Sequence, residues 1–292
     1  MKAVIPKFSL LEAAKLADIE PEPGDNYYLG SFSSPIQIDS FPRRATYFGI
    51  AICLKGSVRL TVGLEHYNLL PGSLIVMPPE VIRTWKDQSP DYVEETLLFK
   101  ELFFLESGLD IKSFREFRFF QIGTPKVIQL NTMDSDVIQN LLQDIKKTIT
   151  RSSKRRDEIV RSYVHILLNQ IADLYDRYYP DVFTRLNTSL KMVSEFKKLL
   201  IEKHHYLRSV NGYADLLNVT AKHLSQTMQE NTGSTAGEWI HNILILEAKV
   251  MLKQTSHTIA EISDSLNFSD PSSFGKYFRR YAGCSPASYR KL

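Results

Sequence analysis

A helical motif occurs twice in the last hundred residues of this chain. Four anchor positions of the first copy recur in the second at one fixed offset. The anchors are Leu224, Met228, Gly233 and Trp239 in the first copy, and Phe274, Phe278, Gly283 and Tyr289 in the second. An internal repeat of this kind predicts two copies of one supersecondary unit, and so constrains the fold before any single residue is interpreted.

Each copy has the pattern of a helix-turn-helix. In the first, apolar residues at helical spacing lead to Asn218, a residue type that tolerates the left-handed backbone of a tight turn. Thr220 is a good N-cap for a second helix, and Gly233 is a typical C-cap. The second copy repeats these signals with Asn267, Ser269 as the expected N-cap, Pro271 in the first turn and Gly283.

The segment between the copies predicts one connecting helix over residues 236–255, because its apolar residues recur at helical spacing. About 20 helical residues span about 30 Å. Successive major-groove segments on one face of B-DNA lie about 34 Å apart. Such a helix could therefore hold the second helices of both copies at adjacent major-groove segments.

The second helix of each copy carries polar residues on its outward side. Gln can pair with adenine edges, Lys with guanine, and Ser with bases or phosphates. An ordinary solvated side chain explains any single one of them, and an all-helical core module is the alternative for the whole repeat. As a set on two matched helices they favour DNA contact. The outward residues are Lys222, His223, Ser225, Gln226 and Gln229, and then Ser272, Ser273, Lys276, Tyr277, Arg279 and Arg280.

Residues 187–292 resemble the DNA-binding domain of the AraC/XylS transcription regulators. The most specific match is IAEISDSLNFSDPSSFGKYFRRYAGCSPASYR, and SVNGYADLLNVTAKHLSQTMQENTG matches as well. The resemblance implies base contacts from Lys222, Ser225 and Gln226 around Leu224, and from Ser272, Ser273 and Lys276 around Phe274. Arg279 and Arg280 belong to a basic segment, Lys276–Lys291, without an acidic residue, and are expected at phosphates. The chain departs from the family at Asn267, where Gly is usual, and at Leu244, where Arg is common in the linking helix.

Length and composition set the wider limits. The 292 residues suffice for two domains, and 43% hydrophobic with 24% charged residues is typical of a globular protein. There is no signal-peptide pattern and no apolar run near the 20 residues of a membrane span. Cys53 and Cys284 suggest two reduced thiols. We therefore expect a cytoplasmic protein with no membrane partner.

Residues 47–104 have the shorter period of β-strands. Strands are expected at 47–54, 57–64, 67–70, 73–77, 83–85 and 92–104, with turn signals at Lys55-Gly56 and Pro71-Gly72. Closely spaced strands predict a small barrel or sandwich. The pattern GSV…Y.L.PGSLIVMPP over about residues 25–105 resembles the cupin-like sensory domain of many AraC relatives.

The expected barrel has few features of an enzyme. Enzymatic cupins bind metal through clustered His and Glu, whereas His66 stands alone here, so no metal site, cofactor or catalytic residue is predicted. A barrel of this size can hold a small organic ligand. Candidate effector-contacting residues are Arg43, Trp85 and Thr96, although Trp85 could equally be core and Arg43 solvated. Residues 1–30, with Pro6, Pro21 and Pro23, could form an arm.

Residues 133–179 return to a helical period in two segments split by a basic run. The second segment has a heptad-like apolar seam, which suits pairing with another helix or with the protein's own barrel. In relatives such a helix pairs two subunits, so the resemblance favours a dimer. The seam consists of Val160, Val164, Leu167, Ile171 and Leu174, followed by Tyr178.

Together these patterns predict a two-domain protein with an all-β cupin-like barrel and an all-α double helix-turn-helix domain. The expected divisions are 1–132 for arm and barrel, 133–180 for a helical dimerisation hairpin, 181–189 for a linker and 190–292 for the DNA-binding domain. The predicted function is a sequence-specific transcription regulator that responds to a small-molecule effector. Its expected partners are double-stranded DNA, the effector, a second copy of the chain and RNA polymerase. The alternatives are a metal-dependent cupin enzyme with a helical appendage and a DNA binder that senses nothing.

Overall fold

The computed structural model describes residues 9–16, 26–33, 41–105, 117–121, 123–180 and 188–291. The chain divides into two compact units, one holding the described residues of 8–40 and 44–184 and the other those of 41–43 and 185–292. Most of the expected N-terminal arm, and residues 181–187 of the expected linker, lie outside the described residues. Residues 188 and 189 already belong to the first helix of the second unit.

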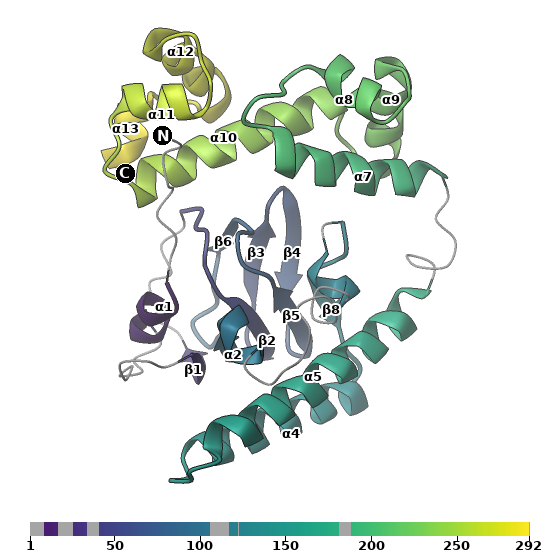
Figure 1. Cartoon of the computed structure of the whole chain (residues 1–292), viewed down its shortest axis with the longest axis vertical. Coiled ribbons are helices and arrows are strands. Elements are labelled where there is room, and N and C mark those ends of the chain that lie inside the picture. The colour runs from purple at the N-terminus through teal and green to yellow at the C-terminus, as the bar shows by residue number, and fades with distance from the viewer. Residues whose placement is uncertain are drawn as a thin grey trace. The chain divides into compact units, whose positions relative to one another are not determined.

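The first unit contains two antiparallel sheets (Figure 1). The five-stranded sheet has the order β1-β7-β2-β5-β8, and the three-stranded sheet has the order β4-β3-β6. The expected all-β N-terminal domain is confirmed. Its strands are β1 Tyr27–Ser33, β2 Phe48–Lys55, β3 Val58–Val62, β4 Glu65–Leu69, β5 Ser73–Met77, β6 Arg83–Lys86, β7 Val93–Phe99 and β8 Val127–Gln129.

Three features of this unit differ from the sequence prediction. The strand expected at 92–104 ends at Phe99, where its pairing with both β1 and β2 also ends, and α2 (Glu101–Leu105) follows. Strands β1 and β8 were not predicted; β8 has only 3 residues, too few to show a period. A short helix, α1 (Leu10–Leu16), buries Leu10 and Ala14 against Tyr28 and Leu98.

The two faces of the five-stranded sheet have different neighbours. One face buries Ile50, Val76 and Leu97 against the helices that follow the strands. The other buries Ala51 and Ile75 against Leu60 and Val62 of the three-stranded sheet. Because side chains alternate along a strand, β2, β5 and β8 each contribute residues to both cores.

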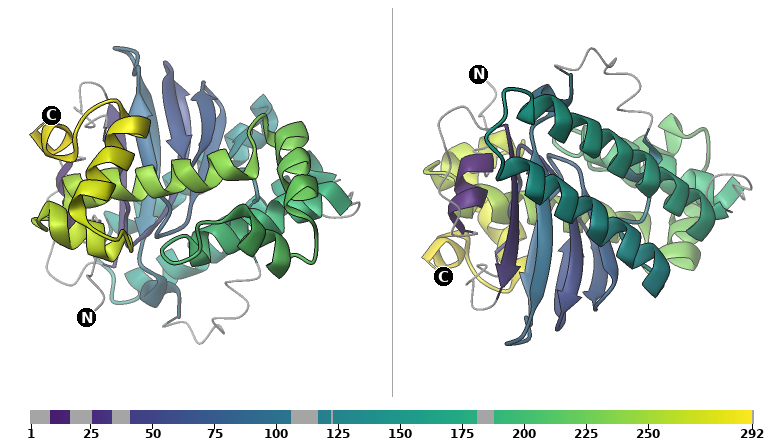
Figure 2. Two further views of the ribbon diagram at one scale, coloured as in Figure 1. Left: turned by 90° about the horizontal axis from the view of Figure 1, so that it is seen from above. Right: turned by 90° about the horizontal axis from the view of Figure 1, so that it is seen from below.

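Helices α4 (Thr132–Ile149) and α5 (Arg156–Tyr178) form the hairpin that covers the first of these faces (Figure 2). The five residues assigned to dimerisation lie in this core, with exposed fractions of 0–2%. The seam therefore packs against the sheet of its own chain, and a subunit contact would have to use other residues of the hairpin. The five residues are Val160, Val164, Leu167, Ile171 and Leu174.

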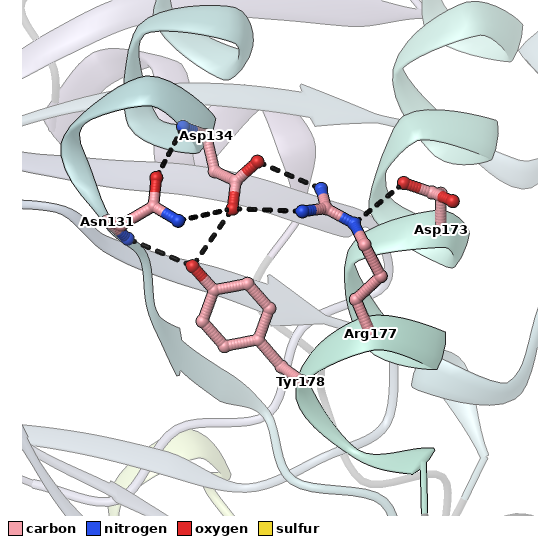
Figure 3. Close-up of polar contacts among 5 residues, drawn as sticks. All are labelled: Asn131, Asp134, Asp173, Arg177 and Tyr178. Atoms are coloured by element: carbon pink, nitrogen blue, oxygen red, sulfur yellow. Dashed lines mark hydrogen bonds and ion pairs between the residues drawn. The ribbon is translucent and has the colours of Figure 1, made fainter.

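A polar cluster joins the start of α4 to the end of α5 (Figure 3). Arg177 donates to both carboxylate oxygens of Asp134, at 2.9 and 3.3 Å, and to Asp173 at 3.0 Å. The hydroxyl of Tyr178 donates to Asp134 at 3.0 Å, and Asn131 caps α4 by accepting from the Asp134 backbone N–H. The hydrogen bond from Arg177 is the largest cause of a lowered pKa at Asp134.

From residue 188 onward, the described part of the second unit consists of helices and the turns that join them. Two small cores lie along α10: one with α7, α8 and α9, the other with α11, α12 and α13 (Figure 1). No helix of the described residues is long and apolar enough to cross a membrane. The helices are α7 Thr188–Lys203, α8 Val210–Leu216, α9 Ala221–Thr232, α10 Ala236–Gln254, α11 Ile259–Ser265, α12 Pro271–Ala282 and α13 Pro286–Lys291.

The turn signals of the repeat lie where the sequence places them, with one exception. Asn218 and Asn267 have φ values of 55° and 56°, the left-handed region that asparagine tolerates. Thr220 caps α9 by accepting from the backbone N–H of His223. The N-cap of α12 is Asp270 rather than Ser269, because Pro271 occupies the first helical position and the Asp270 side chain reaches the backbone of the first turn.

Candidate DNA interface and effector site

Helix α9 is held by its apolar side and leaves its polar side open. Leu224 and Met228 are fully buried in the first helical core. On the opposite side Lys222 and Gln226 are exposed, and Ser225 is half-buried between the two sides. The Gln226 amide donates to Glu230 at 2.8 Å, so it must exchange this partner to reach a base edge.

Helix α12 repeats this arrangement with larger anchors. Phe274 and Phe278 are fully buried in the second helical core. The side that faces away from this core carries one hydroxyl and three cationic groups without an acidic residue. Its exposed residues are Ser272, Lys276, Arg279 and Arg280.

Ser273 differs from the other predicted contact residues because it belongs to the helix cap. It is half-buried, and its hydroxyl donates to the Asp270 carboxylate at 2.7 Å while its backbone N–H donates at 2.8 Å. The hydrogen bond from the Ser273 hydroxyl is the first cause that lowers the pKa of Asp270 to about 2. The geometry gives Ser273 a role in starting α12 that the sequence pattern did not show.

Tyr277 was expected on the outward side but is half-buried. Its hydroxyl lies 2.8 Å from Nδ1 of His241 in α10, and its ring lies 5.1 Å from that of Phe268. Burial, and then the nearby Arg280 cation, lower the pKa of His241. Tyr277 follows Phe274 by three positions, so helical spacing could have placed it on the inner side.

The linking helix α10 has 19 residues and is therefore about 28 Å long. It begins with a capping box formed by Thr235 and Glu238. Leu244, which stands where Arg is common in the family, is 2% exposed and packs in the first helical core.

Trp85 and Thr96 lie on the sides of their strands that face the interior between the two sheets. Trp85 is opposite Leu60, and Thr96 is opposite Ala51, both members of the interior core. By contrast, Arg43 is half-buried and falls with residues 41–43 outside the unit that holds the barrel. The structure brings Trp85 and Thr96 to the barrel interior and assigns Arg43 to the other unit.

The same interior contains charged residues that no sequence pattern indicated. Glu94 is 6% exposed, and accepts from the Tyr92 hydroxyl at 2.5 Å and from the Thr96 hydroxyl at 3.1 Å. Arg83, 5% exposed, lies with its guanidinium 5.0 Å from the Tyr47 ring centre and 5.8 Å from that of Trp85. Burial is the main cause that raises the pKa of Glu94, and the hydrogen bonds from Tyr92 and Thr96, followed by the Arg83 cation, oppose it. A buried acid, a buried cation and hydroxyls beside aromatic rings suit recognition of a polar ligand.

His66 is exposed on β4, with Nδ1 3.0 Å from the hydroxyl of Thr61. Within the described residues the barrel contains no group of three side chains placed to hold a metal ion.

Comparison with protein families agrees with both halves of this description. The family described as "AraC-like ligand binding domain" matches residues 30–168, and the "Helix-turn-helix domain" family matches residues 213–292. The order is a ligand-binding domain followed by two helix-turn-helix copies. The chain belongs to the AraC family of transcription regulators. As an AraC-family protein it is a DNA-binding regulator of transcription with a ligand-binding domain.

Individual relatives have low identity to this AraC-family chain. The Msm operon regulatory protein of Streptococcus mutans is 22% identical over 83% of this chain and 83% of its own length. The lactose operon transcription activator of Staphylococcus xylosus is 24% identical over 54% of this chain and 56% of its own length. Among solved structures, ToxT from Vibrio cholerae covers 91% of this chain and 98% of its own, with 14% identity and a TM-score of 0.42.

Proposed function

We propose that this regulator reads two successive major-groove segments of its operator, one with α9 and one with α12. The observation that supports this most is the pairing of two similarly anchored helices through one helix about 28 Å long. That length is close to the spacing of about 34 Å between successive major-groove segments.

The contact residues are proposed from their exposure and chemistry. Lys222, Ser225 and Gln226 contact bases from α9, and Ser272 and Lys276 do so from α12. Arg279 and Arg280 lie one turn further along α12 and contact phosphates, where a guanidinium can bind two oxygens at once. Ser273 contributes through the cap of α12, since Asp270 already accepts from its hydroxyl.

We also propose that the effector is a small hydroxyl-rich molecule bound in the barrel interior. Arg83, Glu94 and Thr96 offer hydrogen bonds there, and Trp85 offers a ring face on which a sugar could stack. The Staphylococcus xylosus relative is an activator of a lactose operon, and this supports a carbohydrate as the effector. On this proposal the barrel senses a ligand and performs no catalysis.

A thermal-unfolding screen with common sugars and sugar alcohols tests the effector class. Binding to the folded state should raise the unfolding temperature with ligand concentration. Thr96→Val, which removes the hydroxyl at nearly constant volume, should abolish the shift. Arg59→Ala should keep it, because Arg59 lies on β3 with an exposed side chain paired to Asp87. A shift that Thr96→Val leaves unchanged would rule out this site, and no shift with any compound would favour a barrel that only supports assembly.

The subunit contact, a further partner and the location are proposed for a regulator of transcription. The outer side of α5 exposes Ile159 and Ile166, 41% and 48%, one heptad apart, and we propose that two copies pair through this side. RNA polymerase is the further proposed partner, because the Staphylococcus xylosus relative is a transcription activator and activators act on transcription initiation. Since its target is DNA, the protein is proposed to act in the cytoplasm.

A further inference from the structure

A buried histidine and glutamate join the end of α7 to the middle of α10. His204 directly follows α7 and is 3% exposed, while Glu247 in α10 is 1% exposed. Nε2 of His204 lies 3.2 Å from a carboxylate oxygen of Glu247. The half-buried ring of His205 is centred 4.0 Å from that of His204. One ligand atom from each residue falls within 4.8 Å of the others.

The hydrogen bonds of His204 determine which of its ring nitrogens can bind a cation. Nδ1 lies 3.0 Å from the carbonyl oxygens of Leu200 and Ile201, and a carbonyl can only accept, so Nδ1 carries a proton. In the neutral ring Nε2 then presents a lone pair to the Glu247 carboxylate, which can also only accept. Among the described residues Nε2 has no hydrogen-bond partner. Two acceptor atoms at this distance repel each other unless a proton or a metal cation lies between them.

This arrangement is the one in which histidines bind metal ions. A ligating imidazole usually donates its other N–H to a backbone carbonyl, which sets its tautomer and orientation. Zinc bonds of about 2.0–2.1 Å in a tetrahedron place two ligand atoms about 3.3 Å apart, close to the observed 3.2 Å. The His205 ligand atom lies within 4.8 Å of the other two, so a turn of its ring would bring it to this spacing.

We propose that His204, His205 and Glu247 bind one divalent transition-metal ion of the zinc type, with water as a fourth ligand. Two histidines and one carboxylate are a common zinc ligand set. The ion would fasten α7 to α10 behind the first helix-turn-helix, and so stabilise the folded DNA-binding unit. The competing explanation is a doubly protonated His204 paired with Glu247 and no metal. The two explanations make different predictions for His205, because a metal ion would bind it whereas the ion pair of His204 and Glu247 does not involve it.

The test is zinc titration of the full-length protein after dialysis against a chelator, with a chromophoric chelator as competitor. The wild-type chain should bind one zinc ion. His205→Ala and Glu247→Gln should each weaken binding by more than about tenfold. His223→Ala should bind like wild type, because His223 is exposed on α9. Cobalt in place of zinc should give visible absorption bands that His205→Ala lacks.

Circular dichroism shows whether each variant is folded. If Glu247→Gln unfolds, His205→Ala still tests the proposal, because His205 is half-buried and its replacement disturbs the core less. Equal zinc affinity of wild type and folded His205→Ala would overturn the proposal and leave the ion pair. A wild-type chain that binds no zinc would also overturn the proposal. Neither result bears on operator recognition, which is measured with DNA and no added metal.

Discussion

The hydroxyl of Tyr277 lies 2.8 Å from Nδ1 of His241, and this contact joins α12 to the linking helix α10. Tyr277 also packs on Phe268 in the turn before α12. The orientation of α12 therefore depends on a residue that stands between the exposed Lys276 and the buried Phe278.

Tyr277→Phe keeps the ring and removes this hydrogen bond. We expect the DNA-binding unit to lose about 0.5–1.5 kcal/mol of unfolding free energy, the usual contribution of a partly buried hydrogen bond. Urea unfolding measures it. Tyr281→Phe is the control, because Tyr281 is exposed on the same helix and stacks on His241 through its ring. Equal losses in both variants would show that the Tyr277 hydroxyl contributes nothing specific.

His241 should make stability depend on pH. Burial and Arg280 lower the pKa of His241 below its usual 6.5, so the unfolded chain binds this proton more readily than the folded one. The stability gained from a neutral His241 is present above pH 6.5 and is lost as pH falls toward the lowered pKa of the folded state. His241→Gln should flatten this part of the profile in urea unfolding. An unchanged profile would exclude His241 as its source.

The cluster around Asp134 should act as a unit (Figure 3). Asp134→Asn and Arg177→Ala should each reduce stability, and the double variant should lose less than the sum. Because the pKa of Asp134 is lowered, its contribution is present above the unfolded value near 3.9 and is lost as pH falls through the folded value. Thermal unfolding of the four proteins between pH 2 and pH 7 measures this. Additive losses would mean that the pair is not coupled.

The sequence predicted the helical repeat well because its signals are local. Asn218 and Asn267 occupy left-handed turns, and Leu224 and Phe274 are buried where helical spacing places them. The heptad seam was less informative. Its period showed that one side of α5 is buried, but the same period fits a partner subunit or a sheet of the same chain.

Sites built from distant residues left no local signal. Arg83 in β6 and Glu94 in β7 belong to different sheets, and both are buried only because the interior faces of the two sheets pack together. His204 and Glu247 come together across two helices, and no spacing rule connects them. A charged residue in a short strand fits the outer face as well as the interior, so its burial could not be predicted from the pattern.

The two sides of α5 should respond differently to a new charge. Leu167→Asp buries a carboxylate at a fully buried position and should cost the first unit about 4 kcal/mol or more. The double change Ile159→Asp with Ile166→Asp alters exposed residues and should leave the fold intact while converting a dimer to a monomer. Sedimentation at micromolar concentration measures assembly. A folded double variant that still dimerises would exclude this side of the hairpin as the interface.

Selection of bound sequences from random duplex DNA tests the central claim most directly. Wild type should select two short blocks with centres about 10–10.5 base pairs apart, one for each recognition helix. Gln226→Ala and Lys276→Ala should each cost about 1–3 kcal/mol of specific binding and relax a different block. Lys191→Ala, which alters an exposed lysine of α7, should select the wild-type site. A single block, or wild-type selection by both recognition-helix variants, would contradict the reading of two groove segments by α9 and α12.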